Sequence, residues 1–275
     1  VALGVAYAQK VQRFFDTDST IEASTDGEKA SDGPFSVRFD HVSYRYGGSD
    51  EFAIRDLSLA IAPGEKIAIV GENGAGKTTL FRILNGTLPC DGGEVCIDGQ
   101  PFSRARGRAK RAVQKRIGTI YQDFALVEPV SCRQNVLNAC LPDMALPAAL
   151  LGLFSRAQIA EAERLLTRVG LADKCDEPVC DLSGGQKQRV ALAGVLALSP
   201  DILVFDEATA MLDPRGREQV MQTIHHLNKD LGITVVSITH YMEEAAQADR
   251  VLVMSKGHVV MEGTPKEVFS QTEKV

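Results

Sequence analysis

A chain of 275 residues can form one large α/β domain with a substantial buried core, or two small domains. Its formal net charge of −6 argues against a protein that binds nucleic acid, because neutralising phosphates requires a basic surface. No apolar stretch reaches the roughly 20 residues that span a bilayer, so we expect a soluble chain.

Residues 1–33 are predicted to form an N-terminal arm or linker. A short apolar start is followed, over residues 16–33, by an acidic stretch rich in Ser, Thr, Asp and Gly. That composition is typical of linkers. The sequence begins at Val1 rather than at a methionine, which leaves open an earlier start of the natural gene product.

Beyond this arm, strands and helices alternate. Period-two alternation or short apolar runs predict strands over residues 35–39, 42–46, 54–61, 66–70, 94–97, 118–122, 201–205 and 234–239. Helical spacing of apolar residues predicts helices over residues 78–84, 157–169 and 216–227. We expect residues 94–97 to form an edge strand and residues 118–122 a core strand. This order predicts an α/β fold with a doubly wound, mostly parallel sheet.

A glycine-rich loop joins the predicted strand at residues 66–70 to the predicted helix at residues 78–84. Glycine lets successive backbone N–H groups point inward, toward a polyphosphate at the helix N-terminus. The lysine and threonine that close the loop are suited to bind phosphate and magnesium, respectively. We therefore expect nucleotide binding by Gly71, Glu72, Asn73, Gly74, Ala75, Gly76, Lys77, Thr78 and Thr79.

Two further segments point to the same chemistry. Asp206 ends a buried strand, so its carboxylate is expected beside the phosphate loop, where it would hold Mg²⁺ together with Thr78. Residues 182–186 read Leu-Ser-Gly-Gly-Gln and open a helix, which makes a second anion-binding N-terminus. Because residues 71–78 already supply one such site, the second implies a second molecule.

Taken together, the loop at residues 71–78, the pentapeptide at residues 182–186 and the apolar run ending at Asp206 resemble the nucleotide-binding subunits of ATP-binding cassette (ABC) transporters. The resemblance covers roughly residues 35–269. It implies a Mg²⁺-dependent ATPase with a P-loop NTPase fold: a RecA-like core, an antiparallel β-subdomain and an inserted α-helical subdomain. The cassette would span residues 34–275, with the helical subdomain at about residues 123–192.

The resemblance also implies individual roles. Glu207 resembles the catalytic carboxylate that polarises the attacking water, and His240 resembles the histidine that contacts the γ phosphate. Gln122 is expected to reach the Mg²⁺ and the water, and to sense the membrane partner. Tyr46 resembles the residue that stacks on adenine, and Tyr44 is the competing choice.

In this family two cassettes pair head to tail and act on membrane permease subunits. The resemblance therefore implies a homodimer or heterodimer at the cytoplasmic face of the cell membrane, with Asp213 at the dimer interface. No nucleic-acid partner is expected. The residues that would close over the ATP held by the partner are Ser183, Gly184, Gly185 and Gln186.

The type of transporter is less uniformly indicated. Residues 1–80 resemble exporters, the middle of the chain resembles phosphonate-type importers, and residues 182–267 resemble energy-coupling factor importers for vitamins, cobalt or nickel. The last match is the most specific and favours import. The alternatives are an exporter half-transporter, a mosaic of ABC segments, and a soluble ABC ATPase of DNA repair or translation. A soluble ATPase of that kind would carry tandem cassettes or a long coiled-coil insert, and this sequence shows neither.

Three other features have a plain and a functional interpretation. The apolar residues 144–154 form either a buried helix or loop, or a surface that docks on a membrane partner. The basic run at residues 104–116 lacks interleaved aromatic residues, which favours a solvated helix face over a nucleic-acid or acidic partner surface. Six cysteines without C-x-x-C spacing indicate reduced thiols.

Overall fold

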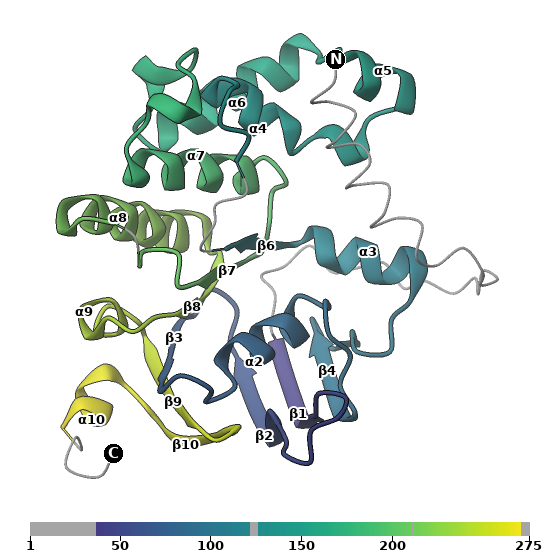
Figure 1. The fold of residues 1–275 in the computed structure, drawn as a ribbon, viewed down its shortest axis with the longest axis vertical. Helices are drawn as coiled ribbons and strands as arrows, with labels where there is room; N and C mark the ends of the chain where they lie inside the picture. The colour runs from purple at the N-terminus through teal and green to yellow at the C-terminus, as the bar shows by residue number, and fades with distance from the viewer. Residues whose placement is uncertain (1–36, 122–125, 211, 271–275) are drawn as a thin grey trace.

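The computed structural model describes residues 37–121, 126–210 and 212–270. Two sheets and a helical layer make up the fold (Figure 1). The smaller sheet is antiparallel and contains, in spatial order, β2 (Ile54–Ile61), β1 (Val37–Tyr44), β4 (Gly92–Ile97) and β5 (Gln100–Pro101). The larger sheet contains, in order, β10 (His258–Gly263), β9 (Arg250–Ser255), β3 (Lys66–Gly71), β8 (Thr234–Ile238), β7 (Ile202–Asp206) and β6 (Ile117–Ile120).

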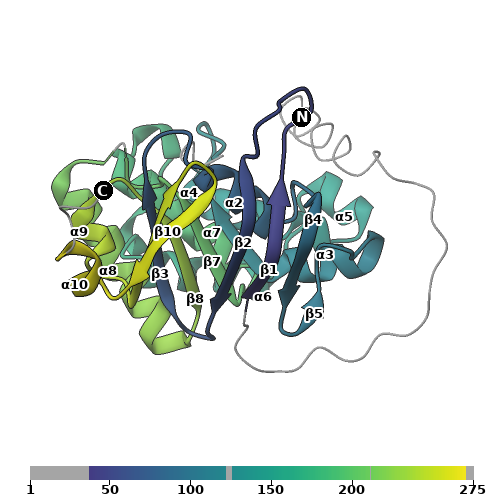
Figure 2. The ribbon, with the colours of Figure 1, turned by 90° about the horizontal axis from the view of Figure 1, so that it is seen from below.

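All neighbours in the larger sheet pair in parallel except β9 and β10. Seen from below, strands of the two sheets run next to each other, and β2 contacts β10 (Figure 2). The predicted doubly wound, mostly parallel sheet with an antiparallel β-subdomain is therefore confirmed. Within the described ranges, no helix has both the length and the apolar character needed to cross a membrane.

The helices connect the strands and form a separate layer. Four of them, α4 to α7, gather at the end of the molecule opposite the smaller sheet (Figure 1). The helices are α2 (Lys77–Leu84), α3 (Gly107–Lys115), α4 (Cys132–Asn138), α5 (Leu146–Leu151), α6 (Arg156–Arg168), α7 (Gly184–Leu196), α8 (Pro214–Leu231), α9 (Met242–Ala245) and α10 (Pro265–Phe269). Single 3₁₀ turns lie at Leu141–Asp143, Ala172–Lys174 and Val179–Asp181.

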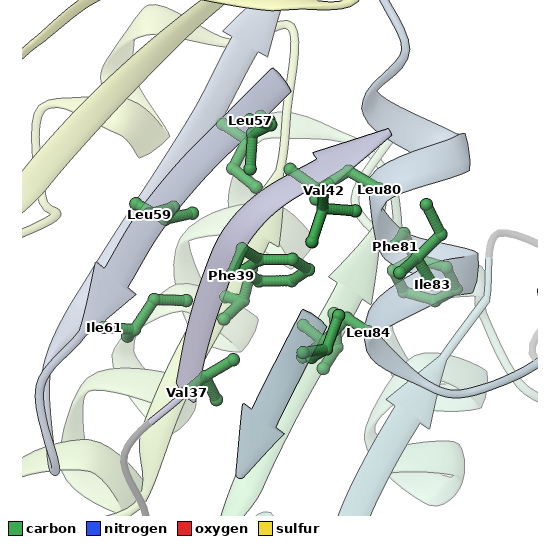
Figure 3. Close-up of a cluster of buried hydrophobic side chains, with 14 of the residues drawn as sticks. Val37, Phe39, Val42, Leu57, Leu59, Ile61, Leu80, Phe81, Ile83 and Leu84 are labelled. Atoms are coloured by element: carbon green, nitrogen blue, oxygen red, sulfur yellow. The ribbon is translucent and has the colours of Figure 1, made fainter. Parts of the chain in front are cut away.

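Three hydrophobic clusters hold these layers together. In the first, side chains of β1 and β2 point toward α2, so that Phe39 shares one buried cluster with Leu80 and Phe81 (Figure 3). The second joins α4, α6, α7 and α8 to β6 and β7, and the third joins β3 and β9 to α9 and α10. Burying each large apolar side chain contributes about 1.5–3 kcal/mol. Because α2 lies within the first cluster, packing fixes the loop that precedes it.

The sequence interpretation of three strands was wrong in detail. Residues 35–39 and 42–46 do not give two strands, because a bulge near His41, whose φ is 50°, lets the single strand β1 continue. β4 is not an edge strand, since it lies between β1 and the two-residue β5. β6 lies at the edge of the larger sheet rather than in its centre, and it reads as a core strand because α7 covers it.

The apolar residues 144–154 form an exposed surface, so their interpretation as a buried helix is wrong. Proline near the start of α5 and the left-handed Gly152 at its end limit this helix to six residues. None of its residues is buried. The exposed fractions of Leu146, Leu150 and Leu151 are 69%, 66% and 71%. In the basic run, α3 buries none of its residues, and the choice of a solvated face over a partner surface stays a prediction.

Two glycines test the packing of α7 on β6. A Cβ at Gly118 would lie 2.3 Å from Val195 Cγ1 and 2.9 Å from Leu203 Cδ2, whereas a Cβ at Gly194 would meet nothing closer than 4.0 Å. We expect Gly118→Ala to lower the free energy of unfolding by about 1–3 kcal/mol through overpacking. Gly194→Ala should raise it by about 0.5–1 kcal/mol through helix propensity. Urea denaturation measures both changes, and equal signs would contradict this packing.

Candidate functional site

The site is built where three neighbouring strands end. β8 lies between β3 and β7 and pairs in parallel with both, and Ile238 is in register with Ile69 on one side and with Asp206 on the other. Because parallel strands end at the same edge of a sheet, the segments that follow them converge there. These segments carry the glycine-rich loop, Glu207 and His240.

The loop between β3 and α2 depends on glycine at a point of close contact. Gly76 is the N-cap of α2 and has φ 98°, in the region that side chains disfavour. A Cβ there would lie 2.4 Å from the carbonyl oxygen of Ala53. Within the described residues, no side chain caps α2. Its first N–H groups and the positive end of its dipole are thus suited to hold an anion.

Lys77 places an ammonium group at the same helix terminus. The residue is 5% exposed, and its Nζ donates to the carbonyl oxygens of Gly71 at 2.7 Å and Glu72 at 2.9 Å. Burial lowers the pKa of Lys77, while the carboxylates of Glu207 and Asp206 oppose that shift. The lysine is therefore bonded to the loop and lies in the electrostatic field of the two acids at the end of β7.

Asp206, Glu207 and His240 lie together at this edge. Burial, and next the neighbouring Glu207, raise the pKa of Asp206, while Arg82 and Lys77 oppose the shift. His240 Nε2 lies 2.6 Å from Glu207 Oε1. Glu207 has φ 49°, and its N–H donates to the Ile238 carbonyl oxygen at 3.1 Å. A non-glycine residue in this conformation costs about 1–3 kcal/mol and is typical of functional sites.

The two candidate aromatic residues differ in exposure. Tyr44 is 9% exposed and belongs to the first hydrophobic cluster, whereas Tyr46 is 40% exposed. The Tyr46 hydroxyl lies 3.2 Å from the hydroxyl of Thr79 in α2. Thr78, which directly precedes Thr79, is exposed. Of the two tyrosines, Tyr46 is the exposed one, and its hydroxyl contacts the helix that follows the glycine-rich loop.

The pentapeptide at residues 182–186 begins α7 as predicted. Ser183 is the N-cap; its hydroxyl accepts from the N–H of Gln186, whose side-chain oxygen accepts from the N–H of Ser183 at 2.9 Å. A Cβ on Gly185 would lie 3.2 Å from the Cα of Gly216, so the starts of α7 and α8 are in close contact. Asp213 caps α8, because its carboxylate accepts from the Gly216 N–H at 3.3 Å.

Gln122 lies outside the described residues. The residue before it, Tyr121, accepts from Asn85 Nδ2 at 3.3 Å and packs edge-on against Phe81 of α2. Burial, and next the Asp206 carboxylate, raise the pKa of Tyr121. The end of β6 therefore reaches the same site from the other side of β7.

A further group at the site was not predicted from the sequence. The buried carboxylate of Glu244 accepts hydrogen bonds from Thr209 and Thr239, and the Nε of Arg217 lies 3.7 Å from it. The only signal in the sequence is an acid four residues after His240, in a segment that reads as polar surface. Burial of that acid depends on the packing of β7, β8 and α8.

The donor set fits a nucleotide with magnesium better than a metal held by protein alone. Among the described residues, no group of three or more His, Cys, Asp or Glu side chains is arranged to hold a metal ion. Mg²⁺ usually takes one or two protein ligands and completes its shell with phosphates and water. The exposed Thr78 hydroxyl and the Asp206 carboxylate are suited to that arrangement beside an anion on α2.

The chain is similar to known transporter ATPases over most of its length. The family model described as ABC transporter matches residues 54–210. An energy-coupling factor transporter ATP-binding protein EcfA1 from Listeria monocytogenes is 40% identical over 237 residues, covering 86% of this chain and 81% of the relative. The EcfA1 of Clostridioides difficile is 43% identical over 238 residues, covering 86% and 82%.

Solved structures give the same result. CbiO1 from Clostridium perfringens, described as part of the ABC transporter complex cbiONQ, has a TM-score of 0.75 and 33% identity, covering 86% of this chain and 91% of its own. The cassette MJ0796, solved as a dimer in a post-hydrolysis state with ADP and Pi, has a TM-score of 0.72 and 29% identity, covering 83% and 98%.

Two loop glycines separate backbone strain from close contact. Gly74 has φ 81° with nothing within 4 Å of a built Cβ, whereas Gly76 combines φ 98° with the contact to Ala53. Gly74→Ala should cost about 1–2 kcal/mol of unfolding free energy. Gly76→Ala should cost about 1–3 kcal/mol more, because the backbone must also move. Urea denaturation of the nucleotide-free protein measures the difference; equal losses would mean that the loop does not rest on Ala53.

Proposed function

The chain belongs to the ABC transporter family and is an ATPase that drives transport, and from this premise we propose that it is the ATPase subunit of an energy-coupling factor importer. The observation that carries this proposal is the similarity to EcfA1 proteins, which extends over 86% of the chain. We assign residues 34–275 to one nucleotide-binding domain, with its helical subdomain at about residues 123–192. Residues 1–33 are assigned to an arm.

In this proposal the phosphates of ATP bind to residues 71–79. Lys77 exchanges its bonds to the Gly71 and Glu72 carbonyl oxygens for phosphate oxygens, which offsets the cost of a buried ammonium group. The first N–H groups of α2 supply the remaining donors. The exposed ring of Tyr46 is assigned to stack on adenine, and burial of Tyr44 in the core supports that choice.

Thr78 and Asp206, with Gln122, would hold the magnesium ion. When bound, this ion neutralises phosphate charge during transfer to water. The raised pKa of Asp206 fits this role, because a nearby cation would favour the charged carboxylate that burial disfavours.

Hydrolysis is assigned to the pair at the ends of β7 and β8. Glu207 would orient the attacking water and act as the general base that accepts its proton, while His240 would contact the γ phosphate. The 2.6 Å separation between His240 Nε2 and Glu207 Oε1 supports their action as one unit. The hydrogen bond from the Glu207 N–H to the Ile238 carbonyl oxygen ties the position of Glu207 to β8, beside the segment that carries His240.

A second cassette would complete the site. The start of α7 offers N–H groups to an anion, yet α2 of the same chain already provides a phosphate site. We assign Ser183, Gly184, Gly185 and Gln186 to ATP held by a partner cassette, either identical or different. Contact between the starts of α7 and α8 supports placing Asp213 in the same interface. The dimeric state of MJ0796 is consistent with this pairing.

Membrane permease subunits would bind the helical layer, near residues 122–129 and α5, which places the chain at the cytoplasmic face of the cell membrane. Leu146, Leu150, Leu151 and Leu153 form an exposed apolar surface there, with exposed fractions of 61% or more. Surfaces of this kind mark interaction sites. No such surface would be needed by an ATPase that acted alone.

The role of Glu207 is tested by Glu207→Gln. We expect phosphate release at saturating MgATP to fall by about 10²–10⁴-fold, the usual contribution of a general base, with ATP affinity changed by less than about threefold. Phosphate-release assays and calorimetric titration with ATP measure these two quantities. Glu218→Gln, on the exposed surface of α8, is the matched control. Unchanged turnover in Glu207→Gln would remove this residue from the chemistry.

The docking surface is tested by Leu150→Asp. A charge in an apolar interface must be desolvated, so the fraction of protein that sediments with permease-containing membranes should fall at least about tenfold, because 1.4 kcal/mol already gives that factor. Val260→Asp places the same charge on β10, where Val260 is 55% exposed, and should leave binding intact. Equal binding of both variants would place the permease elsewhere.

A further inference from the structure

One acid near the site is buried, and its hydrogen bonds run to the segments that follow β7 and β8. Glu244 lies in α9 and is 4% exposed, whereas its neighbour Glu243 is exposed. Burial of a carboxylate is costly unless its oxygens are satisfied. Its two oxygens each accept a hydrogen bond from a threonine hydroxyl.

These two threonines come from the loops that carry the proposed catalytic pair. Thr209 lies two residues after Glu207 and bonds to Oε1 of Glu244. Thr239 directly precedes His240 and donates to Oε2 at 2.6 Å. Both threonines are buried, with exposed fractions of 5% and 2%. A single carboxylate therefore joins the segment after β7 to the segment after β8.

The surrounding charges stabilise this carboxylate. Arg217 Nε lies 3.7 Å from Glu244 Oε1, and the guanidinium of Arg217 stacks over the ring of Tyr241, 3.4 Å from its centroid. The buried Lys66 lines the same small cavity as Glu244 and Thr209. Burial lowers the pKa of Lys66, and the nearby Asp249 and Glu244 oppose that shift. Removing the carboxylate would thus deprive Arg217 and Lys66 of a nearby negative charge. It would also deprive the two threonine hydroxyls of their hydrogen-bond acceptor.

We propose that Glu244 is a positioning residue that holds Glu207 and His240 in contact by fixing the loops on which they lie. This inference rests on the proposed ATPase site and adds a residue whose side chain contacts Thr209, Thr239 and Arg217 rather than Glu207 or His240 themselves. Thr239 transmits the constraint further, because its hydroxyl also accepts from the N–H of Tyr241 at 3.0 Å. The phosphate loop is not part of this network.

The expected effect is therefore on turnover rather than on ATP binding. In Glu244→Gln the side chain keeps its size, but an NH2 group replaces one oxygen and cannot accept the hydrogen bond of a threonine hydroxyl. We expect kcat to fall at least about tenfold with the KM for ATP within about threefold, because misplaced groups affect the reacting geometry. The matched control is Glu243→Gln, which removes the same charge from the adjacent exposed position.

A double-mutant cycle distinguishes positioning from general destabilisation. Thr209→Val removes the hydroxyl that donates to Glu244 Oε1. If the two groups act through one contact, kcat of the double variant should match that of Glu244→Gln within about threefold, because coupled substitutions are not additive. The proposal would be overturned if the folded double variant lost kcat by the product of the two single losses. It would also be overturned if Glu244→Gln had the same kcat as Glu243→Gln.

A readout without turnover separates this inference from the proposed function. The ring-nitrogen NMR signals of His240 in the nucleotide-free protein report its contact with Glu207. They should shift in Glu244→Gln and stay in place in Glu243→Gln. If the wild type hydrolysed no ATP, the proposed function would fail while these signals still decided the role of Glu244. Unshifted signals in Glu244→Gln would overturn the positioning role, even in an active ATPase.

Discussion

Parallel pairing of β8 with both β3 and β7 is the constraint on which the site depends. With Ile238 in register with Ile69 and Asp206, three segments leave the sheet at one edge. The first carries Lys77, the second Glu207 and the third His240. A shift of either pairing would separate the phosphate loop from the acid and the histidine, and no local change in the loops could restore the contact.

The site contains charged groups and a backbone conformation that lower the stability of the fold. Lys77 is buried against carbonyl oxygens, Asp206 is desolvated beside Glu207, and Glu207 has a left-handed backbone conformation. Each feature costs free energy, and the three surrounding clusters of buried apolar side chains offset that cost. Anion binding at α2 would relieve the first, and a magnesium ion beside the anion would relieve the second. The fold therefore holds these charged groups in place without a ligand, as the proposed polyphosphate site requires.

The sequence predicted what depends on local pattern. Glycines at residues 71–76 and the apolar run before Asp206 identified the loop and the fold class because backbone conformation and strand burial are local requirements. The positions of β4 and β6 in their sheets depend on strands that are distant in sequence, and the predictions of these positions were wrong. Glu244 was missed for the same reason, since nothing near it in sequence indicates burial. The roles assigned to the individual site residues, Gln122 and Asp213 included, stay predictions.

The central claim is that ATP binds on α2 between Lys77 and the Glu207–His240 pair. A crystal structure of the full chain with magnesium and a non-hydrolysable ATP analogue tests it most directly. We predict that Lys77 Nζ leaves the carbonyl oxygens of Gly71 and Glu72 for the phosphates, and that the terminal phosphate lies within hydrogen-bond reach of His240. An analogue bound elsewhere, with Lys77 still on both carbonyls, would contradict this account.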